Sequence, residues 1–205
     1  MIIRKQYRVE MGHIVRNCSS DRCAHSMHGH SAIIEVLLEG TALDNAGMLY
    51  DFGLMKGTVK QFIDLFDHCY VFWDKDNPEY IKAVKKFCDR WISLPFNPTA
   101  EMLSLMFMNA INTILENTTK ENKESVDLHC CGVIYHETES GYAKCCPEDN
   151  LTMWDVNNLS RMEYSPVLKV GLHSTPLEDI MNGALVHPSS LPFDQVKANA
   201  CGFAQ

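Results

Sequence analysis

The chain has 205 residues, a hydrophobic fraction of 46% and a formal net charge of −8 at neutral pH. This length suits one domain, or one domain with an appendage, and the composition suits an ordinary globular core. The acidic balance argues against a general surface for nucleic acid or for anionic membranes. No apolar stretch typical of a secretory signal follows the first residues, and the apolar run from Met102 to Leu115 is too short to span a bilayer. We therefore expect a cytoplasmic protein.

Nine cysteines are present, and four of them form the adjacent pairs Cys130-Cys131 and Cys145-Cys146. An odd number and adjacent pairs do not resemble the disulfide framework of a secreted protein. We expect free thiols, most of them acting as small buried hydrophobic residues.

The first half of the chain predicts two strands and a helix. Residues 2–11 alternate loosely between polar and apolar, and residues 31–39 are rich in β-branched and aliphatic side chains and end at Gly40. The stretch 41–47 predicts a turn. From Leu54 onward the apolar residues recur at helical spacing: Met55, Val59, Phe62, Ile63 and Phe66.

A second helix is predicted to start near Asn97-Pro98-Thr99, because Asn or Thr can cap a helix and Pro fits its first turn. Its buried side would hold Leu103, Met106, Ala110, Ile111, Ile114 and Leu115. We expect a polar, charged turn at residues 116–125 to close this helix. Strands are then predicted at residues 126–136 and 141–146.

The order strand, strand, helix, helix, strand, strand predicts an α+β domain, with an antiparallel sheet and two helices packed on one face. Five of the eight prolines lie from Pro147 onward, where no long periodic stretch remains. We therefore assign residues 1–147 to the domain and residues 148–205 to an irregular C-terminal extension.

The motif with the sharpest chemical meaning is His28-Gly29-His30, which runs into the second strand. Side chains at i and i+2 of a strand share a face, so both imidazoles point the same way. His13 ends the first strand, which would pair antiparallel with the second. Three neutral imidazoles leave one coordination position open, as in a catalytic zinc site. The competing interpretations are a turn with solvated histidines and a ligand role for His25.

Cys23 lies just before this pair of histidines. It could be a fourth zinc ligand or a thiolate that moves protons, since a nearby metal or cationic His lowers a thiol pKa. Cys18, in the same loop, is a rival candidate for this role. The alternative for both residues is an inert loop cysteine.

Two further positions carry candidate chemistry. Asp67-His68 ends the first predicted helix, and a carboxylate beside an imidazole can fix its tautomer and raise its basicity. Glu137-Thr138 follows an apolar run, and the carboxylate could accept two hydrogen bonds from an amidine-like ring edge. A helix-end cap and an exposed strand-end acid are the respective alternatives.

Taken in order, these motifs resemble the 6-pyruvoyl-tetrahydropterin synthase and 6-carboxy-tetrahydropterin synthase family. The matching segments cover roughly residues 9–146. They are Val9-Glu10-Met11-Gly12-His13, Cys23 with His28-Gly29-His30, Gly47-Met48-Leu49-Tyr50-Asp51-Phe52, Phe66-Asp67-His68, Asn97-Pro98-Thr99-Ala100-Glu101, and Glu137-Thr138. Four residues separate Cys23 from His28, where the carboxy branch commonly has three and the animal pyruvoyl branch five, so spacing does not choose between them.

The resemblance implies the tunnelling fold, in which several subunits close into an oligomeric barrel, usually a hexamer, with active sites between subunits. It also implies a zinc-dependent lyase acting on 7,8-dihydroneopterin triphosphate. The implied roles are zinc ligation by His13, His28 and His30, acid–base catalysis by Cys23 and by His68 oriented by Asp67, and pterin binding by Glu137 assisted by Thr99.

Of the two branches we favour 6-carboxytetrahydropterin synthesis, which feeds 7-deazaguanine and queuosine, because it is the widespread microbial activity. The alternatives are 6-pyruvoyl-tetrahydropterin synthesis and a non-catalytic, zinc-stabilised binding or assembly module. For the triphosphate, the basic residues near the motifs are candidates, although a solvated surface role competes for each: Arg16, Arg22 and Lys56.

Overall fold

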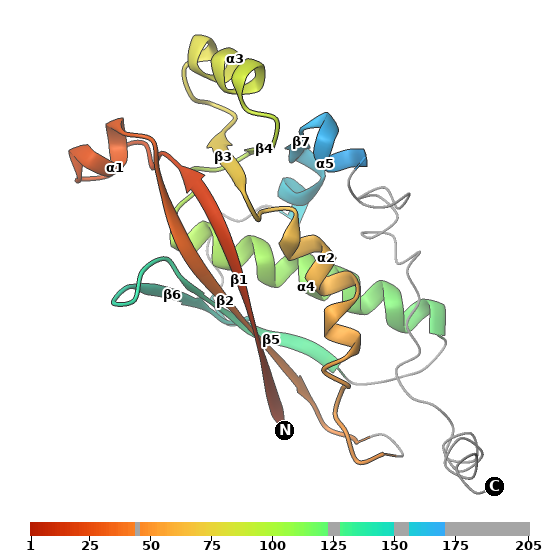
Figure 1. The fold of residues 1–205 in the computed structure, drawn as a ribbon. Helices are drawn as coiled ribbons and strands as arrows, with labels where there is room; N and C mark the ends of the chain where they lie inside the picture. Colours follow the sequence, from red (N-terminus) through yellow and green to blue (C-terminus); the bar gives the residue numbers. More distant parts are fainter. Residues whose placement is uncertain (44–45, 123–127, 150–155, 171–205) are drawn as a thin grey trace, which may run out of the picture.

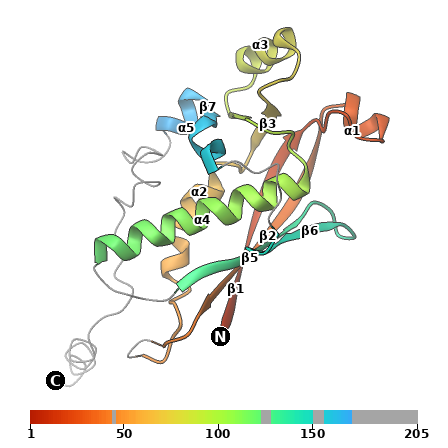
Figure 2. The ribbon, with the colours of Figure 1, turned by 180° about the vertical axis from the view of Figure 1, so that it is seen from behind.

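The computed structural model describes residues 1–43, 46–122, 128–149 and 156–170. Its centre is a seven-stranded mixed sheet, with helices α2 (Thr58–Asp64) and α4 (Ala100–Asn122) on one face (Figures 1 and 2). In spatial order the strands are β6 (Tyr142–Cys145), β5 (Leu128–His136), β2 (His28–Gly40), β1 (Ile2–His13), β3 (Cys69–Trp73), β4 (Trp91–Leu94) and β7 (Glu163–Tyr164). Within these residues no helix is both long and apolar enough to cross a membrane.

The long β1–β2 pair forms the frame of the sheet. Its antiparallel register runs from Ile2 opposite Glu39 to His13 opposite His28. Alternate residues of each strand face the helices and are buried, among them Val9 and Ile34, while the residues between them face away. The strands predicted at residues 2–11 and 31–39 are confirmed, and both extend further toward the histidines.

The sheet is not entirely antiparallel, which corrects one part of the predicted architecture. β3 pairs parallel with β1, and β4 pairs parallel with β3 after a crossover through helix α3 (Pro78–Phe87). All four residues of β4 and four of the five in β3 are buried, so neither strand shows the alternation that identifies a half-exposed strand. Asn77 caps α3 by accepting the N–H groups of Glu79 and Tyr80.

The first predicted helix is confirmed but divided. A 3-10 turn (Leu54–Lys56) is followed by α2 (Thr58–Asp64), with Gly57 between them. The residues of the predicted apolar stripe are all at most 3% exposed: Met55, Val59, Phe62, Ile63 and Phe66.

The second predicted helix is α4 (Ala100–Asn122), and Thr99 caps it by accepting the N–H of Met102 at 3.2 Å. The six residues predicted for its buried side are all at most 4% exposed. The expectation that residues 116–125 form a turn was wrong as far as Asn122, because this segment contains no Gly or Pro to end the helix.

The core between the helices and the sheet holds an aromatic cluster. The rings of Phe62, Phe66 and Phe107 lie with centroids 4.9–6.1 Å apart, and Tyr135 of β5 stacks on Phe107. This packing fixes α4 across β5, so that the first turn of α4 lies beside the ends of β1 and β2 (Figure 2).

Part of the predicted C-terminal extension packs on the domain. A 3-10 helix (Val156–Arg161) leads into β7, which pairs with β4, and then into α5 (Pro166–Val170). Tyr164 and Leu168 belong to the main core and are 7% and 2% exposed. The domain boundary after residue 147 stays a prediction, and residues 150–155 and 171–205 of the extension lie outside the described part.

Each of the eight cysteines in the described residues is free. Cys69, Cys130 and Cys145 are buried, and burial raises the pKa of each of these thiols. They act as small apolar core residues.

Candidate metal centre and active site

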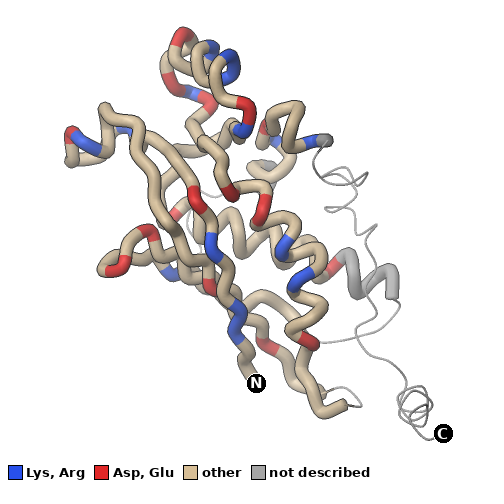
Figure 3. The backbone as a smooth tube through the Cα atoms, in the orientation of Figure 1, with Lys and Arg blue, Asp and Glu red and all other residues tan. Residues whose placement is uncertain are grey.

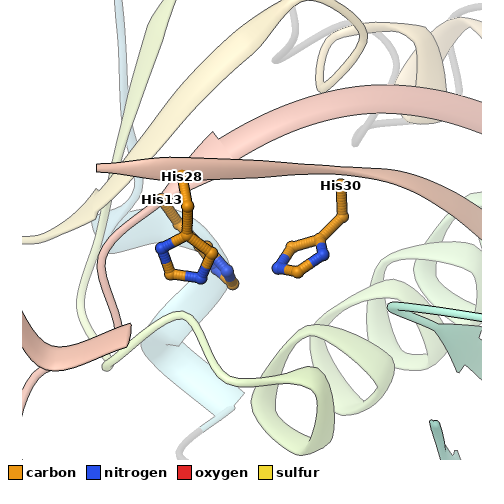
Figure 4. A group of neighbouring side chains, drawn as sticks. All are labelled: His13, His28 and His30. Carbon is orange, nitrogen blue, oxygen red and sulfur yellow. The ribbon is translucent and has the colours of Figure 1, made fainter. Parts of the chain in front are cut away.

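Three histidines converge at the end of the β1–β2 pair (Figure 4). His13 lies opposite His28, and His30 lies opposite Met11, so strand alternation puts all three imidazoles on the face that carries the helices. Gly29 lies between two of them, and a Cβ at this position would come within 3.1 Å of the Met11 carbonyl oxygen. The glycine therefore permits the close approach of the two strands.

The three imidazoles are close enough to share one ion. Each offers a ring nitrogen, and these atoms all lie within 4.8 Å of one another. The Nε2 atoms of all three are buried and have no hydrogen-bond partner among the described residues. Because a buried polar atom without a partner is costly, this arrangement is typical of a site that could hold a metal ion.

Backbone carbonyls fix the orientation of two of the rings. His13 Nδ1 lies 2.9 Å from the Pro98 oxygen, and His28 Nδ1 lies 2.9 Å from the Ser26 oxygen. A carbonyl only accepts hydrogen bonds, so both Nδ1 atoms carry the proton and both Nε2 atoms keep a lone pair. This is the usual arrangement for histidines that bind a metal through Nε2.

The surroundings also favour the neutral form of His13 and His30. Burial, together with the neighbouring His28 and His30, lowers the pKa of His13 from 6.5 to about 4. Burial and His28 likewise lower the pKa of His30, against an opposing effect of Glu137. Neutral imidazole is the form that coordinates a metal.

Glu137, the residue after β5, brings its carboxylate close to these imidazoles. Its Oε1 lies 3.5 Å from His13 Nε2 and 3.7 Å from His30 Nε2, and its side chain is 29% exposed. The structure thus brings together four of the predicted site residues, contributed by three strands. Thr99 is the residue after Pro98, at the start of α4, where its hydroxyl oxygen caps the helix.

Cys23 lies on α1 (Asp21–His25), in the segment that joins His13 to His28. Its carbonyl accepts the Val15 N–H at 2.9 Å, and its side chain is half-buried. Among the residues described, no hydrogen bond or ion pair joins its thiol to the imidazoles. The rival Cys18 donates from Sγ to the Ser20 carbonyl at 3.3 Å, and His25 is exposed.

Asp67 and His68 lie on the opposite face of the sheet. This face is polar, since exposed charged residues such as Arg8 and Glu10 alternate along β1 with core residues (Figure 3). Asp67 Oδ1 accepts the Glu10 N–H at 2.9 Å, and Asp67 Oδ2 lies 3.9 Å from His68 Nε2. His68 adopts a positive φ of 52° and its side chain is 75% exposed.

An open pocket of about 420 Å³ lies beside His68, and its lining includes Glu10, Gly12 and Ser31 of the polar face and also His30. Glu10 and Gly12 alternate with Met11 and His13, so the His68 side of this pocket and the imidazoles of His13 and His28 lie on opposite faces of the sheet.

Sequence reasoning missed the two carbonyls that orient His13 and His28, because a backbone oxygen has no signature in the sequence. It also missed the partner of Arg16, whose Nε donates to Asp76 Oδ2 at 2.8 Å. The other two candidates for a triphosphate, Arg22 and Lys56, are exposed.

Comparison with known proteins gives a consistent result. The family model described as 6-pyruvoyl tetrahydropterin synthase matches residues 2–148. A Helicobacter pylori (strain J99) protein is 42% identical over 149 residues, covering 73% of this chain and 74% of that protein. An Aquifex aeolicus protein is 30% identical over 131 residues, covering 56% of this chain and 80% of its own. Both relatives are named 6-carboxy-5,6,7,8-tetrahydropterin synthase.

Solved structures share the fold. An uncharacterized protein from Wolinella succinogenes superimposes with a TM-score of 0.57 at 19% identity, covering 72% of this chain and 98% of that one. A 6-pyruvoyl tetrahydropterin synthase from Plasmodium falciparum gives 0.51 at 15% identity, covering 71% and 96%. These findings confirm the resemblance seen in the sequence motifs. The chain belongs to the 6-pyruvoyl tetrahydropterin synthase family.

Proposed function

We propose that this chain is a zinc-dependent 6-carboxy-5,6,7,8-tetrahydropterin synthase that acts on 7,8-dihydroneopterin triphosphate. The observation that carries the proposal is the convergence of three imidazoles, with unpartnered Nε2 atoms, beside the carboxylate of Glu137. The choice of reaction within the family follows the name of the Helicobacter pylori relative, which is 42% identical.

His13, His28 and His30 would hold the zinc ion. The donor set fits, because the three imidazole Nε2 atoms are buried without partners, and a tetrahedral site with one open position requires three such ligands. When bound, the ion acts as a Lewis acid on the oxygens of the substrate side chain and so acidifies the adjacent C–H and O–H bonds.

Glu137 would bind the edge of the pterin ring. A carboxylate accepts two parallel N–H donors, and the N–H and NH₂ groups of a pterin present such a pair. Since Oε1 of Glu137 lies within 3.7 Å of two of the imidazoles, a ring held there has its side chain next to the metal position. Thr99, next to Pro98, would assist this binding.

Cys23, as the thiolate, would remove a proton from the substrate side chain, and His68 would donate or accept one as its partner, oriented by Asp67. Because His68 lies on the polar face of the sheet and the imidazoles of His13 and His28 of its own chain lie on the other, the His68 that serves a site would come from another copy. This arrangement favours a homo-oligomer with active sites between subunits, such as the hexameric barrel expected from the resemblance. The queuosine pathway and a cytoplasmic location remain predictions from the sequence.

Product identification tests this function. Zinc-loaded protein is incubated with 7,8-dihydroneopterin triphosphate, and the products are measured by mass and by an acetaldehyde assay. We expect 6-carboxytetrahydropterin, acetaldehyde and triphosphate. A pyruvoyl product without acetaldehyde would show the other branch of the family, and no conversion by intact zinc-loaded protein would leave a binding module.

A further inference from the structure

Arg16 joins two segments that are far apart in the sequence. It follows β1, three residues after His13, and its Nη1 donates to the Ala24 carbonyl of α1 at 2.8 Å. Its Nε donates to Asp76 Oδ2, between β3 and α3, also at 2.8 Å. One guanidinium therefore links the helix that carries Cys23 to the β3–α3 connection.

The link is largely shielded from solvent. The side chain of Asp76 is 7% exposed and that of Arg16 is 24% exposed. The guanidinium also lies over the ring of Tyr80 on α3, 5.1 Å from its centroid. A planar fork that bonds two acceptors and stacks on an aromatic ring is a geometry that Lys cannot reproduce.

The backbone of Arg16 is held from a third direction. Its N–H donates to Asn97 Oδ1 at 3.0 Å, and its carbonyl accepts from Asn97 Nδ2 at 2.6 Å. Asn97 precedes Pro98, whose carbonyl orients His13. Arg16 thus lies where the start of α4, the end of β1 and α1 meet.

Helix α1 depends on such contacts. It has five residues, of which only Ala24 is buried, and Ser20 makes no side-chain cap. A helix this short is not stable by itself. The position of the α1 backbone that carries Cys23 therefore depends on the bonds that reach it from outside, from Arg16 to the Ala24 carbonyl and from the Val15 N–H to the Cys23 carbonyl.

We propose that Arg16 is a positioning residue, which, held by Asp76, fixes the α1 segment so that the Cys23 thiol is directed at the substrate. The inference rests on the proposed function, in which Cys23 is the base. It gives Arg16 a role different from phosphate binding, and it makes the β3–α3 connection part of the catalytic apparatus.

The test compares Arg16→Gln, Arg16→Lys and the wild type in the full-length, zinc-loaded protein. The matched control is Glu163→Gln, which breaks the ion pair between Lys85 of α3 and Glu163 of β7, 2.6 Å long, without touching α1. Four quantities are measured: zinc per chain, thermal midpoint, kcat and KM, and the rate at which iodoacetamide alkylates Cys23, followed by peptide mass spectrometry.

We expect Arg16→Gln to keep its zinc, to alkylate at Cys23 about fivefold faster or more, and to lose about 10- to 100-fold in kcat with KM little changed, since misplacement of a reacting group by about 1 Å has effects of this size. Arg16→Lys should lie between Arg16→Gln and the wild type, and Glu163→Gln should match the wild type.

Wild-type kcat and alkylation in Arg16→Gln would overturn the proposal. So would loss of zinc, or a raised KM with unchanged kcat, which would indicate metal or phosphate binding instead. If Arg16→Gln does not fold, Asp76→Asn, which has nearly the same shape, is measured in its place, with smaller changes expected in the same directions. If the wild type shows no turnover, the proposed function fails, and the alkylation rates still decide whether Arg16 positions Cys23.

Discussion

Acid should destabilise the metal-free protein through His13. Its pKa is about 4 in the folded chain and 6.5 ordinarily, so the unfolded chain binds the proton more tightly. The stability that depends on neutral His13 is therefore complete above about pH 6.5 and is lost as the pH falls from there toward about 4. Between about pH 7 and about pH 5 this group should cost about 2 kcal/mol of unfolding free energy.

The measurement is urea unfolding of protein stripped of metal with a chelator, at both pH values. His13→Gln is compared with the wild type, because Gln can still donate to the Pro98 carbonyl but does not titrate. The change in unfolding free energy between the two pH values is compared for the two proteins. The difference gives the contribution of His13, since the other titrating groups are common to both.

The reasoning would be refuted if the free energy of unfolding changed by the same amount between the two pH values in the wild type and in His13→Gln. This result would mean that His13 takes up its proton in the folded chain as easily as in the unfolded one. Burial and the neighbouring imidazoles would then not hold His13 neutral.

Four further changes have expected outcomes. Cys23→Ala should keep its zinc by metal analysis and lose about 10²–10⁴-fold in kcat; full activity would remove Cys23 as the base. Glu137→Gln should also keep its zinc and lose about 10- to 100-fold in kcat/KM through weaker pterin binding, whereas an unchanged value would place the ring elsewhere. Thr99→Ala should cost about 1 kcal/mol in urea unfolding and Thr99→Ser much less, because the lost group is a helix cap. Leu168→Ala should cost about 2–5 kcal/mol in the same assay; a value near zero would show that residues 156–170 do not share the core.

The sequence predicts those parts of the fold that carry a periodic pattern. The helical stripe that contains Phe62 and the alternation along β1 and β2 both identify the right element. β3 and β4 were not predicted, because a short, continuously buried strand has no alternation of polar and apolar residues. Helix α3 was also not predicted, although Asn77-Pro78 is the same kind of helix start signal as Asn97-Pro98 before α4.

In the candidate site too, some features follow from the local sequence pattern and others depend on how distant segments pack. His28 and His30 share a strand, so their common direction follows from local geometry, and His13 joins them through the pairing of β1 with β2. The distance from Glu137 to these rings depends on where β5 ends relative to β2, which residue spacing does not give. The separation of His68 from His13 and His28 by the sheet depends on how the chain passes from α2 into β3 beside β1.

Zinc analysis of the purified protein tests the central claim most directly. After loading and dialysis, we expect one zinc ion per chain, with X-ray absorption showing three nitrogen ligands at about 2.0–2.1 Å. His28→Ala should lose the ion. A wild-type protein that retains no zinc, or a His28→Ala variant that retains a full equivalent, would contradict the assignment of the three histidines as its ligands.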